Sequence, residues 1–337
     1  MANQVTDPEP EIQAFVVAHG LAHADEPVRW HPLTGGVSSD IWQVELPGRS
    51  ICVKRARATL KVESEWRAPV SRNAYEWAWM QFAVRHCPEN VPHPLAHDPE
   101  AGLFAMAFLA PEEHPVWKQQ LMAGEVSINT ARAVGQLVGR LHAASAGCSE
   151  LAGAFDTAIN FHALRLEPYL IATAAHHPQI ALKLHQLVER TSNIRVALVH
   201  GDVSPKNILV GPQGPILLDA ECAWFGDPAF DLAFCLSHLL LKWLVRPERR
   251  GELIEAYGAL AVTYLEHVTW EPPLNLEERA AHLIPALLLA RVDGRSPAEY
   301  LTEHQRADVR MRALPLLHRP VESLSLVAEA YAGMSKS

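Results

Sequence analysis

The sequence predicts an α+β fold of two lobes, a small β-rich N-terminal lobe and a larger, mainly helical C-terminal lobe. Apolar and polar residues alternate with period two between residues 33 and 55, as in half-buried strands. Beyond residue 111, apolar residues recur at helical spacing over several segments. A chain of 337 residues is long enough for two domains. We expect them at 1–110 and 111–337.

The composition is that of an ordinary globular protein and limits its partners. Apolar residues make up 49% and charged residues 20%, and 38 acidic residues against 29 Lys and Arg give a formal charge of −9. An acidic balance argues against nucleic acid and an anionic membrane surface as partners. The most apolar stretch, 232–245, is too short to span a bilayer and is expected to be a buried helix. The sequence leaves the oligomeric state open.

Cysteine usage indicates a cytoplasmic protein. Five cysteines are scattered along the chain without a C-x-x-C pair, which favours reduced thiols. Residues 1–10 lack a basic region and an apolar core, so no secretory signal is expected. The 18 histidines show no metal-ligand spacing and favour structural or surface roles.

The N-terminal lobe is expected to begin with a helix and a β-hairpin. Residues 10–20 have amphipathic spacing between a proline and a glycine. Strands are expected at 41–46 and 50–55, joined by a Pro-Gly turn. Gly35 and Gly36 precede the first of these strands, and a Gly-Gly pair marks a turn in many proteins.

The rest of this lobe combines one helix with one buried strand. Lys54 lies inside the second hairpin strand, and Glu76 lies on a helix expected over 69–86, so the two side chains could face each other. Residues 88–99 read as a connection rich in proline and histidine. A continuous apolar run at 103–109 fits a buried strand.

The C-terminal lobe is expected to be helical apart from one stretch. A long central helix is expected at 128–144, followed by a helical pair interrupted by Pro168. The expected helices after it are 161–175, 178–191, 232–245 and, at about these bounds, 252–267, 276–292 and 320–332.

The exception, residues 198–221, carries oxygen-bearing side chains at the ends of apolar runs. The pattern reads as strand, loop, strand, turn, strand. Asp202 follows the first apolar run, and Asn207 directly precedes the second. Asp219 and Glu221 stand at the end of the third run. Polar groups at strand ends are held rigidly, which favours a catalytic site here.

The motifs of this stretch point to one family. The spacing Asp-x-x-x-x-Asn from Asp202 to Asn207 matches the catalytic loop of kinases. His200-Gly201-Asp202, followed by Gly-x-x-x-x-Asp-Leu-Ala at 226–233, resembles the aminoglycoside phosphotransferase and choline kinase-like family of small-molecule kinases. The alternative is that His200 and Asp202 only cap a turn, but the ordered set of motifs argues against it.

This resemblance implies a protein-kinase-like fold and transfer of the γ-phosphate of ATP to a hydroxyl group of a small molecule. Asp202 would be the catalytic base, and Asn207 and Asp219 would hold Mg²⁺ through oxygen ligands. Asp219-Ala220-Glu221 is similar to the Asp-x-Glu motif of methylthioribose kinases, in which the Glu also serves the metal, so Glu221 joins the predicted ligands. Asn207 stands where that subgroup can carry a different residue.

The resemblance also implies an ATP site in the N-terminal lobe. Lys54 would bind the α- and β-phosphates and pair with Glu76. The alternative for Lys54 is an exposed strand lysine, and the alternative for 103–109 is a plain core strand. The implied phosphate-covering loop contains Gly35, Gly36 and Ser38 (or Ser39) without a full G-x-G-x-x-G, and the implied adenine-binding hinge contains Phe108 and Leu109. The rivals are Arg55, Arg57 and Lys61 for the cation and Glu63 and Glu65 for the acid.

The acceptor is expected to be small. Asp231 follows Asp219 by only twelve positions, which leaves no room for the long activation segment with which protein kinases grip peptides. A sugar, an amino alcohol and an aminoglycoside all remain open as acceptors. The rival function is a nucleotide-binding regulator without turnover. Asp231, His200 and His142 are expected to have structural roles, with Asp231 anchoring the catalytic loop.

One basic patch near the C-terminus allows two interpretations. Arg291 and Arg295 flank Gly294 at the expected end of a helix. An ordinary C-cap with basic residues is favoured. The alternative is that Arg291 or Arg295 reaches the acceptor pocket.

Overall fold

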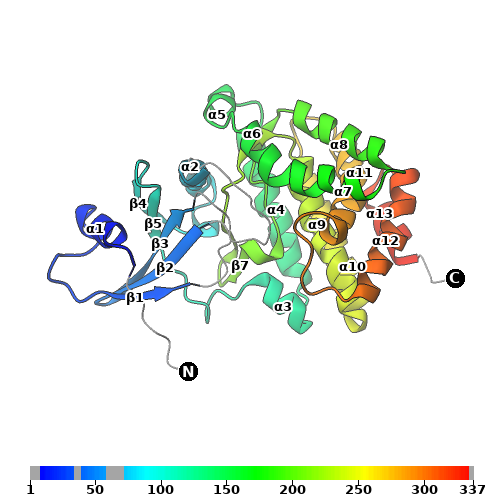
Figure 1. Cartoon of the computed structure of the whole chain (residues 1–337). Helices are drawn as coiled ribbons and strands as arrows, with labels where there is room; N and C mark the ends of the chain where they lie inside the picture. The colour runs from blue at the N-terminus through cyan, green and yellow to red at the C-terminus, as the bar shows by residue number, and fades with distance from the viewer. Residues whose placement is uncertain (1–7, 34–38, 58–71, 334–337) are drawn as a thin grey trace. The chain divides into compact units, whose positions relative to one another are not determined.

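The computed structural model describes residues 8–33, 39–57 and 72–333 of the chain (Figure 1). The chain divides into two compact units, Met1–Pro111 and Glu112–Ser337. Within the described residues, no helix is both long and apolar enough to cross a membrane. The α+β fold class predicted from the sequence is confirmed, since a small antiparallel sheet occupies the first unit and helices dominate the second (Figure 1).

The N-terminal unit is built on a five-stranded antiparallel sheet of order β1-β2-β3-β5-β4. The predicted hairpin and the predicted strand at 103–109 are confirmed as β2, β3 and β5. Residues 88–99 are not only a connection, because they contain β4. The elements are α1 Pro10–Ala18, β1 Arg29–Pro32, β2 Ser39–Leu46, β3 Arg49–Ala56, α2 Arg72–His86, the 3-10 helix η1 Pro88–Asn90, β4 Pro94–Asp98 and β5 Leu103–Ala107.

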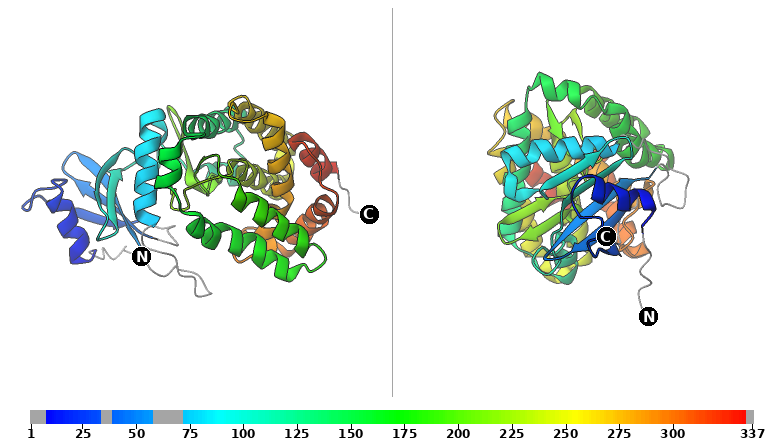
Figure 2. Two further views of the ribbon diagram at one scale, coloured as in Figure 1. Left: turned by 90° about the horizontal axis from the view of Figure 1, so that it is seen from above. Right: turned by 90° about the vertical axis from the view of Figure 1, so that its left-hand side faces the viewer.

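Strand alternation assigns each face of this sheet to one helix. Val53 pairs with Ala105 in the register of β3 and β5. Both belong to a core that also contains Ile12 and Phe15 of α1, so α1 covers this face (Figure 2). The next pair, Lys54 and Phe104, points to the opposite face. Trp77 of α2 packs against Phe104 there, with ring centroids 6.1 Å apart.

The C-terminal unit is mainly helical, with two short β-ladders (Figures 1 and 2). β6 pairs with β9, and β7 with β8, both antiparallel. Its strands and 3-10 turns are β6 Ala197–Val199, η3 Pro205–Asn207, β7 Ile208–Gly211, β8 Gly214–Leu217, β9 Trp224–Gly226 and η4 Pro247–Arg249.

The predicted helices are confirmed in type, and further helices appear between them. The helical pair around Pro168 contains a π-helix, η2, in which this proline lies. The helices are α3 Trp117–Ala123, α4 Ile128–Ser145, α5 Ser149–Ala154, α6 Ala158–Phe161, η2 His162–Ile171, α7 Ala172–His176, α8 Ala181–Asn193, α9 Ala229–Val245, α10 Arg250–Leu265, α11 Pro273–Asp293, α12 Glu303–His318 and α13 Leu324–Gly333.

Two helices pack so closely that only glycine fits at their contact. A Cβ atom on Gly135 of α4 would lie 2.3 Å from the carbonyl oxygen of Leu260 in α10. Gly139, one turn later, would place a Cβ atom 3.1 Å from the carbonyl oxygen of Tyr264. The backbones of α4 and α10 therefore approach along a glycine stripe.

Gly135→Ala is expected to lower the free energy of unfolding by about 1–3 kcal/mol, because the methyl group forces the two helices apart. Gly258→Ala is the matched control, since its Cβ atom would meet nothing within 4 Å. That change is expected to stabilise α10 by about 0.5–1 kcal/mol through helix propensity. Urea denaturation of both variants measures the difference, and equal effects would contradict the close approach.

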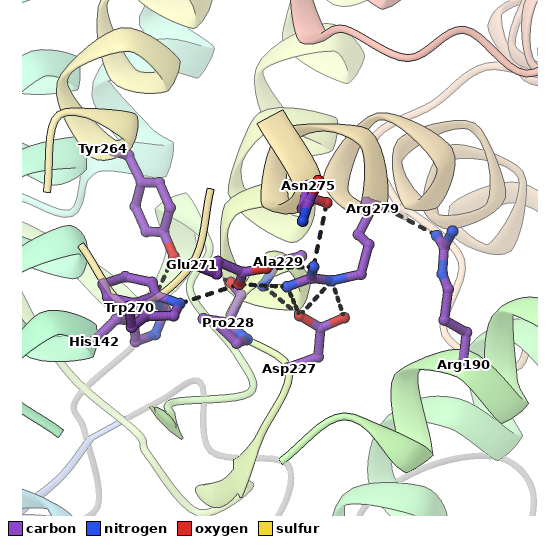
Figure 3. Close-up of polar contacts among 10 residues, drawn as sticks. All are labelled: His142, Arg190, Asp227, Pro228, Ala229, Tyr264, Trp270, Glu271, Asn275 and Arg279. Carbon is purple, nitrogen blue, oxygen red and sulfur yellow. Dashed lines mark hydrogen bonds and ion pairs between the residues drawn. The ribbon is translucent and has the colours of Figure 1, made fainter. Parts of the chain in front are cut away.

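A buried ion network holds the start of α9 (Figure 3). Asp227 is fully buried, and its carboxylate accepts hydrogen bonds from Arg279 Nε at 3.1 Å and Nη2 at 3.1 Å. It also accepts one from the backbone N–H of Ala229 at 3.1 Å. Both terminal nitrogens of Arg279 donate to Glu271 as well, each at 2.7 Å (Figure 3). Asp227 therefore links the N-terminus of α9 to α11.

Candidate active site

A loop between β6 and β7 carries the first predicted site residues, and Gly201 determines its course. Gly201 has φ of +79°, which favours glycine. A Cβ atom there would lie 2.7 Å from the carbonyl oxygen of Cys222. The glycine of His200-Gly201-Asp202 is therefore required both by backbone conformation and by the close approach of the segment after β8.

Asp231 of α9 anchors this loop through hydrogen bonds to its backbone. Its two carboxylate oxygens accept hydrogen bonds from the N–H groups of His200 at 2.7 Å and Gly201 at 2.8 Å. His142 Nε2 lies 3.2 Å from Oδ2 of Asp231, and its Nδ1 lies 2.8 Å from the hydroxyl of Tyr264. The structural roles predicted for Asp231 and His142 are confirmed.

His200 braces the loop with its ring. Nδ1 accepts a hydrogen bond from the backbone N–H of Asp202 at 3.2 Å, so the proton is on Nε2, which donates to the carbonyl of Leu218 at 3.1 Å. Burial lowers the pKa of His200, although the carboxylates of Asp231, Asp202 and Asp219 act to raise it. The neutral ring therefore serves as a scaffold, as the sequence predicted.

Asp202 is the best candidate for accepting a proton. It is only 2% exposed, and its Oδ2 lies 2.8 Å from Arg165 Nη2 and 3.1 Å from Lys206 Nζ. Its other oxygen, Oδ1, is buried and has no hydrogen-bond partner in the described part of the chain. A buried carboxylate oxygen without a donor is unusual, and a bound hydroxyl group would satisfy it.

Arg165 is a site residue that the sequence analysis missed. It lies on η2, donates to the carbonyl of Gly201 at 2.5 Å and pairs with Asp202. Burial acts to lower the pKa of Arg165, but Asp202, Cys222, Tyr169 and Glu221 together outweigh burial, and the pKa is raised. The one available signal was an arginine between Leu164 and Leu166 in an apolar helical segment, because a buried arginine needs a carboxylate partner.

The predicted metal ligands Asn207 and Asp219 are brought together at the base of the β7–β8 hairpin. The backbone N–H of Leu218 donates to the carbonyl of Asn207 at 2.9 Å, so Asp219 directly follows this contact. Asn207 Nδ2 donates to the carbonyl of Asp202 at 3.1 Å, which leaves its Oδ1 as the possible ligand atom. Asp219 has φ of +67°, a strained conformation for a residue with a side chain.

These groups fit Mg²⁺ in chemistry. Carboxylate and amide oxygens are the hard ligands that Mg²⁺ prefers, usually with one or two carboxylates and several waters. No group of three His, Cys, Asp or Glu residues suited to a metal occurs among the described residues. Glu221 is nearly buried and its charge acts on Arg165. Its place among the ligands stays a prediction.

In the N-terminal unit, Lys54 and Glu76 form the expected pair. Lys54 on β3 is 3% exposed, and its Nζ lies 2.8 Å from Oε1 and 2.7 Å from Oε2 of Glu76 on α2. The two rivals that the structure describes have other partners. Arg55 makes two 2.7 Å hydrogen bonds to Glu9, and Arg57 binds Asp40. Lys61, Glu63 and Glu65 lie outside the described residues.

The remaining nucleotide-site predictions fall in two places. Gly35, Gly36 and Ser38 lie outside the described residues. Phe108 and Leu109 follow the end of β5 and are half-buried. The hinge interpretation thus concerns the segment after the strand, and it stays a prediction.

Comparison with known proteins agrees with these motifs. The sequence model of a family described as "Phosphotransferase enzyme family" matches residues 29–272. The methylthioribose kinase of Escherichia coli O45:K1 is 24% identical over 61% of this chain, and the match spans 56% of that relative. The methylthioribose kinase of Bacillus cereus strain G9842 is 22% identical over 95% of this chain and 91% of its own length.

A solved structure shows the same fold. It is amicoumacin kinase hAmiN in complex with AMP-PNP, Ca²⁺ and Ami, with a TM-score of 0.55 and 14% identity. The similarity covers 88% of this chain and 90% of that one. The protein-kinase-like fold that the resemblance implied is therefore confirmed.

Proposed function

The chain belongs to the phosphotransferase enzyme family, and from this we propose that it transfers the γ-phosphate of ATP to a hydroxyl group of a small molecule. The resemblance read from His200-Gly201-Asp202 is confirmed at the level of the family. The observation that carries the proposal is the carboxylate of Asp202, whose Oδ1 is buried and unpartnered among the described residues. It lies in the same loop as Asn207, whose amide donates to the Asp202 backbone.

In this reaction Asp202 would act as the general base. The acceptor oxygen forms a bond to the γ-phosphorus, the bond from that phosphorus to the β–γ bridging oxygen breaks, and ADP leaves. The acceptor proton passes to Asp202 Oδ1, while Arg165 and Lys206 hold Oδ2 and fix the direction of the carboxylate. Phosphoryl transfer depends mainly on such positioning and on charge neutralisation.

The nucleotide would bind as a magnesium complex. Asn207 Oδ1 and the Asp219 carboxylate would hold the metal, with Glu221 as a third predicted ligand. The bound ion would supply positive charge to the phosphate oxygens. Lys54, held by Glu76, would contact the α- and β-phosphates. We place the reaction in the cytoplasm, because all five cysteines are free.

Mg-ATP is expected to stabilise the protein against heat. At 100 times Kd, a ligand that binds only the folded state adds about 2.7 kcal/mol to the free energy of unfolding. Differential scanning fluorimetry with Mg-ATP, and with Mg²⁺ and ATP alone as controls, measures this shift. No shift at millimolar Mg-ATP would contradict a nucleotide site.

A second measurement separates the enzyme from its rival. Acceptor-dependent ADP release, assayed over sugars, amino alcohols, aminoglycosides and hydroxy acids, is expected for a phosphotransferase. A non-catalytic regulator would show the Mg-ATP thermal shift with no turnover on any acceptor.

A further inference from the structure

Lys242 on α9 is a buried lysine that has no counter-ion among the described residues. It is 1% exposed, and its Nζ lies 3.8 Å from the centroid of the Tyr300 ring. In the part of the chain that the structure describes, neither a hydrogen bond nor an ion pair joins Nζ to a carboxylate. Burial, together with the charges of Lys118 and Arg291, lowers the pKa of Lys242 to about 7. Burying a charge in this way costs stability unless a partner compensates it.

Lys118 also lies near this tyrosine, and the charge of Arg291 acts on both Tyr300 and Lys242. We call Lys118, Lys242 and Arg291 the cationic cluster. Lys118 Nζ lies 5.3 Å from the Tyr300 centroid and is bound to Glu299. Glu299 is the one carboxylate whose charge acts on Lys242 among the groups that shift its pKa. That carboxylate is already bound by Lys118, so it cannot fully compensate three cations.

Arg291 is turned inward. Its Nη1 donates to the carbonyl of Ser296 and to the Ser296 hydroxyl at 2.9 Å, while its Nε is buried without a hydrogen-bond partner among the described residues. Arg295, by contrast, is half-exposed and pairs with Glu167 at 3.0 Å. The α11 helix does end beside Gly294, as the C-cap interpretation predicts. A C-cap does not explain why the Nε of Arg291 is buried.

The cationic cluster lies close to the catalytic loop. Arg165, which binds Asp202, has its guanidinium 5.8 Å from the centroid of Tyr169. Arg291 lies 5.9 Å from the same centroid, with its Nη1 3.5 Å from the Tyr169 hydroxyl. Tyr169 is thus flanked by an arginine of the Asp202 site and an arginine of the cluster.

His238 lies where charges from both groups act on it. It lies one helical turn before Lys242 on α9 and is buried. Burial lowers the pKa of His238, and the charges of Arg291, Lys242, Lys206 and Lys118 lower it further. Lys206, which pairs with Asp202, and the cluster therefore act on one ring. That ring stays neutral, so it adds no charge to compensate the cluster.

We propose that the cationic cluster binds a carboxylate or phosphate group of the acceptor, so that the substrate is an anionic hydroxyl compound. An acceptor held by its anionic group at Lys242 and Arg291 would extend toward Asp202 and present a hydroxyl there. Aminoglycosides and quaternary amino alcohols carry positive charge and would be repelled by the same residues. This inference rests on the proposed function, because it concerns the acceptor of that reaction.

The first test compares anionic acceptors with neutral sugars of the same carbon skeleton. ADP release is measured with D-gluconate against D-glucose and with D-ribose 5-phosphate against D-ribose, and with choline and kanamycin as cationic acceptors. We expect kcat/KM for at least one anionic member to exceed that of its neutral partner by tenfold or more. The two pairs distinguish a carboxylate from a phosphate. Preferred turnover of choline, kanamycin or a neutral sugar would overturn the inference and leave the phosphotransferase function standing.

Variants separate acceptor binding from nucleotide binding. Lys242→Met and Arg291→Gln are each expected to raise KM for the anionic acceptor at least tenfold and to leave KM for ATP unchanged. Lys242→Arg keeps the charge and is expected to retain acceptor binding. A rise in KM for ATP alone would show that the cluster serves the nucleotide phosphates and would overturn the inference.

A binding measurement decides the matter even without turnover. Inorganic phosphate and citrate, at constant ionic strength set with chloride, are expected to raise the melting temperature of the wild type more than that of Lys242→Met or Arg291→Gln. Because Lys242 loses its proton above about pH 7, phosphate affinity should fall up to tenfold from pH 7.5 to 8.5, and Lys242→Arg should abolish that change. Equal shifts in all variants overturn the inference, whereas a cluster-dependent shift without turnover on any acceptor counts against the proposed function alone.

Discussion

Asp202→Asn is expected to lower kcat by about 10²–10⁴-fold, the usual contribution of a general base, while the thermal shift with Mg-ATP persists. The substitution keeps the shape of the side chain and one oxygen near Arg165 and Lys206, but it removes the basic oxygen that would accept the acceptor proton. Nucleotide binding is expected to survive, because the predicted metal and phosphate contacts belong to Asn207, Asp219 and Lys54.

The control must account for the ion pair that the substitution weakens. Arg165 is buried, so loss of the Asp202 charge is expected to cost some stability, which the melting temperature will show. Asp156→Asn removes an exposed carboxylate that pairs with Arg195 at 2.8 Å and should change neither rate nor stability appreciably. Turnover of Asp202→Asn at the parental rate would exclude Asp202 as the base.

The catalytic loop could be predicted because its information is local. His200, Asp202, Asn207 and Asp219 lie within twenty residues of one another, and each ends or begins an apolar run. A short connection is enough to bring them together, since β7 and β8 form a hairpin. Lys54 and Glu76 could also be paired, because a strand lysine opposite the only buried acid of the next helix has few other partners.

Other features could not be predicted, because their cause is distant in the chain. Arg165 pairs with Asp202 across 37 positions, and no period or motif signals that contact. Lys242 lies in a run that reads as a buried helix, and its neighbours Lys118 and Arg291 come from other elements. Sequence patterns show which residues are buried but not which distant charges meet.

The strand β4 and the helix α12 were missed because their local sequence signals are weak. β4 has no buried residue: Leu95 is exposed and its other four residues are half-buried, so Pro94 and His97 read as part of a loop. α12 has few buried positions among many charged residues and contains Pro315, which weakens the helical pattern. Tertiary packing, not the local signal, defines both elements.

Arg279→Met is expected to lower the free energy of unfolding by about 3–5 kcal/mol, because it leaves the buried carboxylate of Asp227 without its cation. Glu271→Gln is the matched control. It keeps the contact between Arg279 and Asp227 and removes a charge from a less buried partner, so it should cost much less (Figure 3). Urea denaturation at pH 7 compares the two, and equal losses would mean that Asp227 does not depend on Arg279.

The pH dependence of this loss identifies its cause. Burial raises the pKa of Asp227 above its ordinary value, and Arg279 opposes that rise. Without Arg279 the pKa rises further, so folding then favours the protonated acid. An acid whose folded pKa is raised loses stability as pH increases from its unfolded to its folded value. The deficit of Arg279→Met should therefore shrink between pH 7 and pH 4.5, whereas a loss caused by packing alone would stay constant.

Arg279→Met is also expected to lower activity, because α9 connects Asp227 to the active site. Asp227 fixes the first turn of this helix by accepting the N–H of Ala229, and Asp231 lies one turn later, where it holds the backbone of His200 and Gly201. A displaced first turn would move Asp231 and thereby the loop that presents Asp202. At a temperature where Arg279→Met is still folded, its kcat should fall while Glu271→Gln keeps the parental value. Unchanged turnover in the folded variant would show that Asp231 positions the loop independently of Asp227.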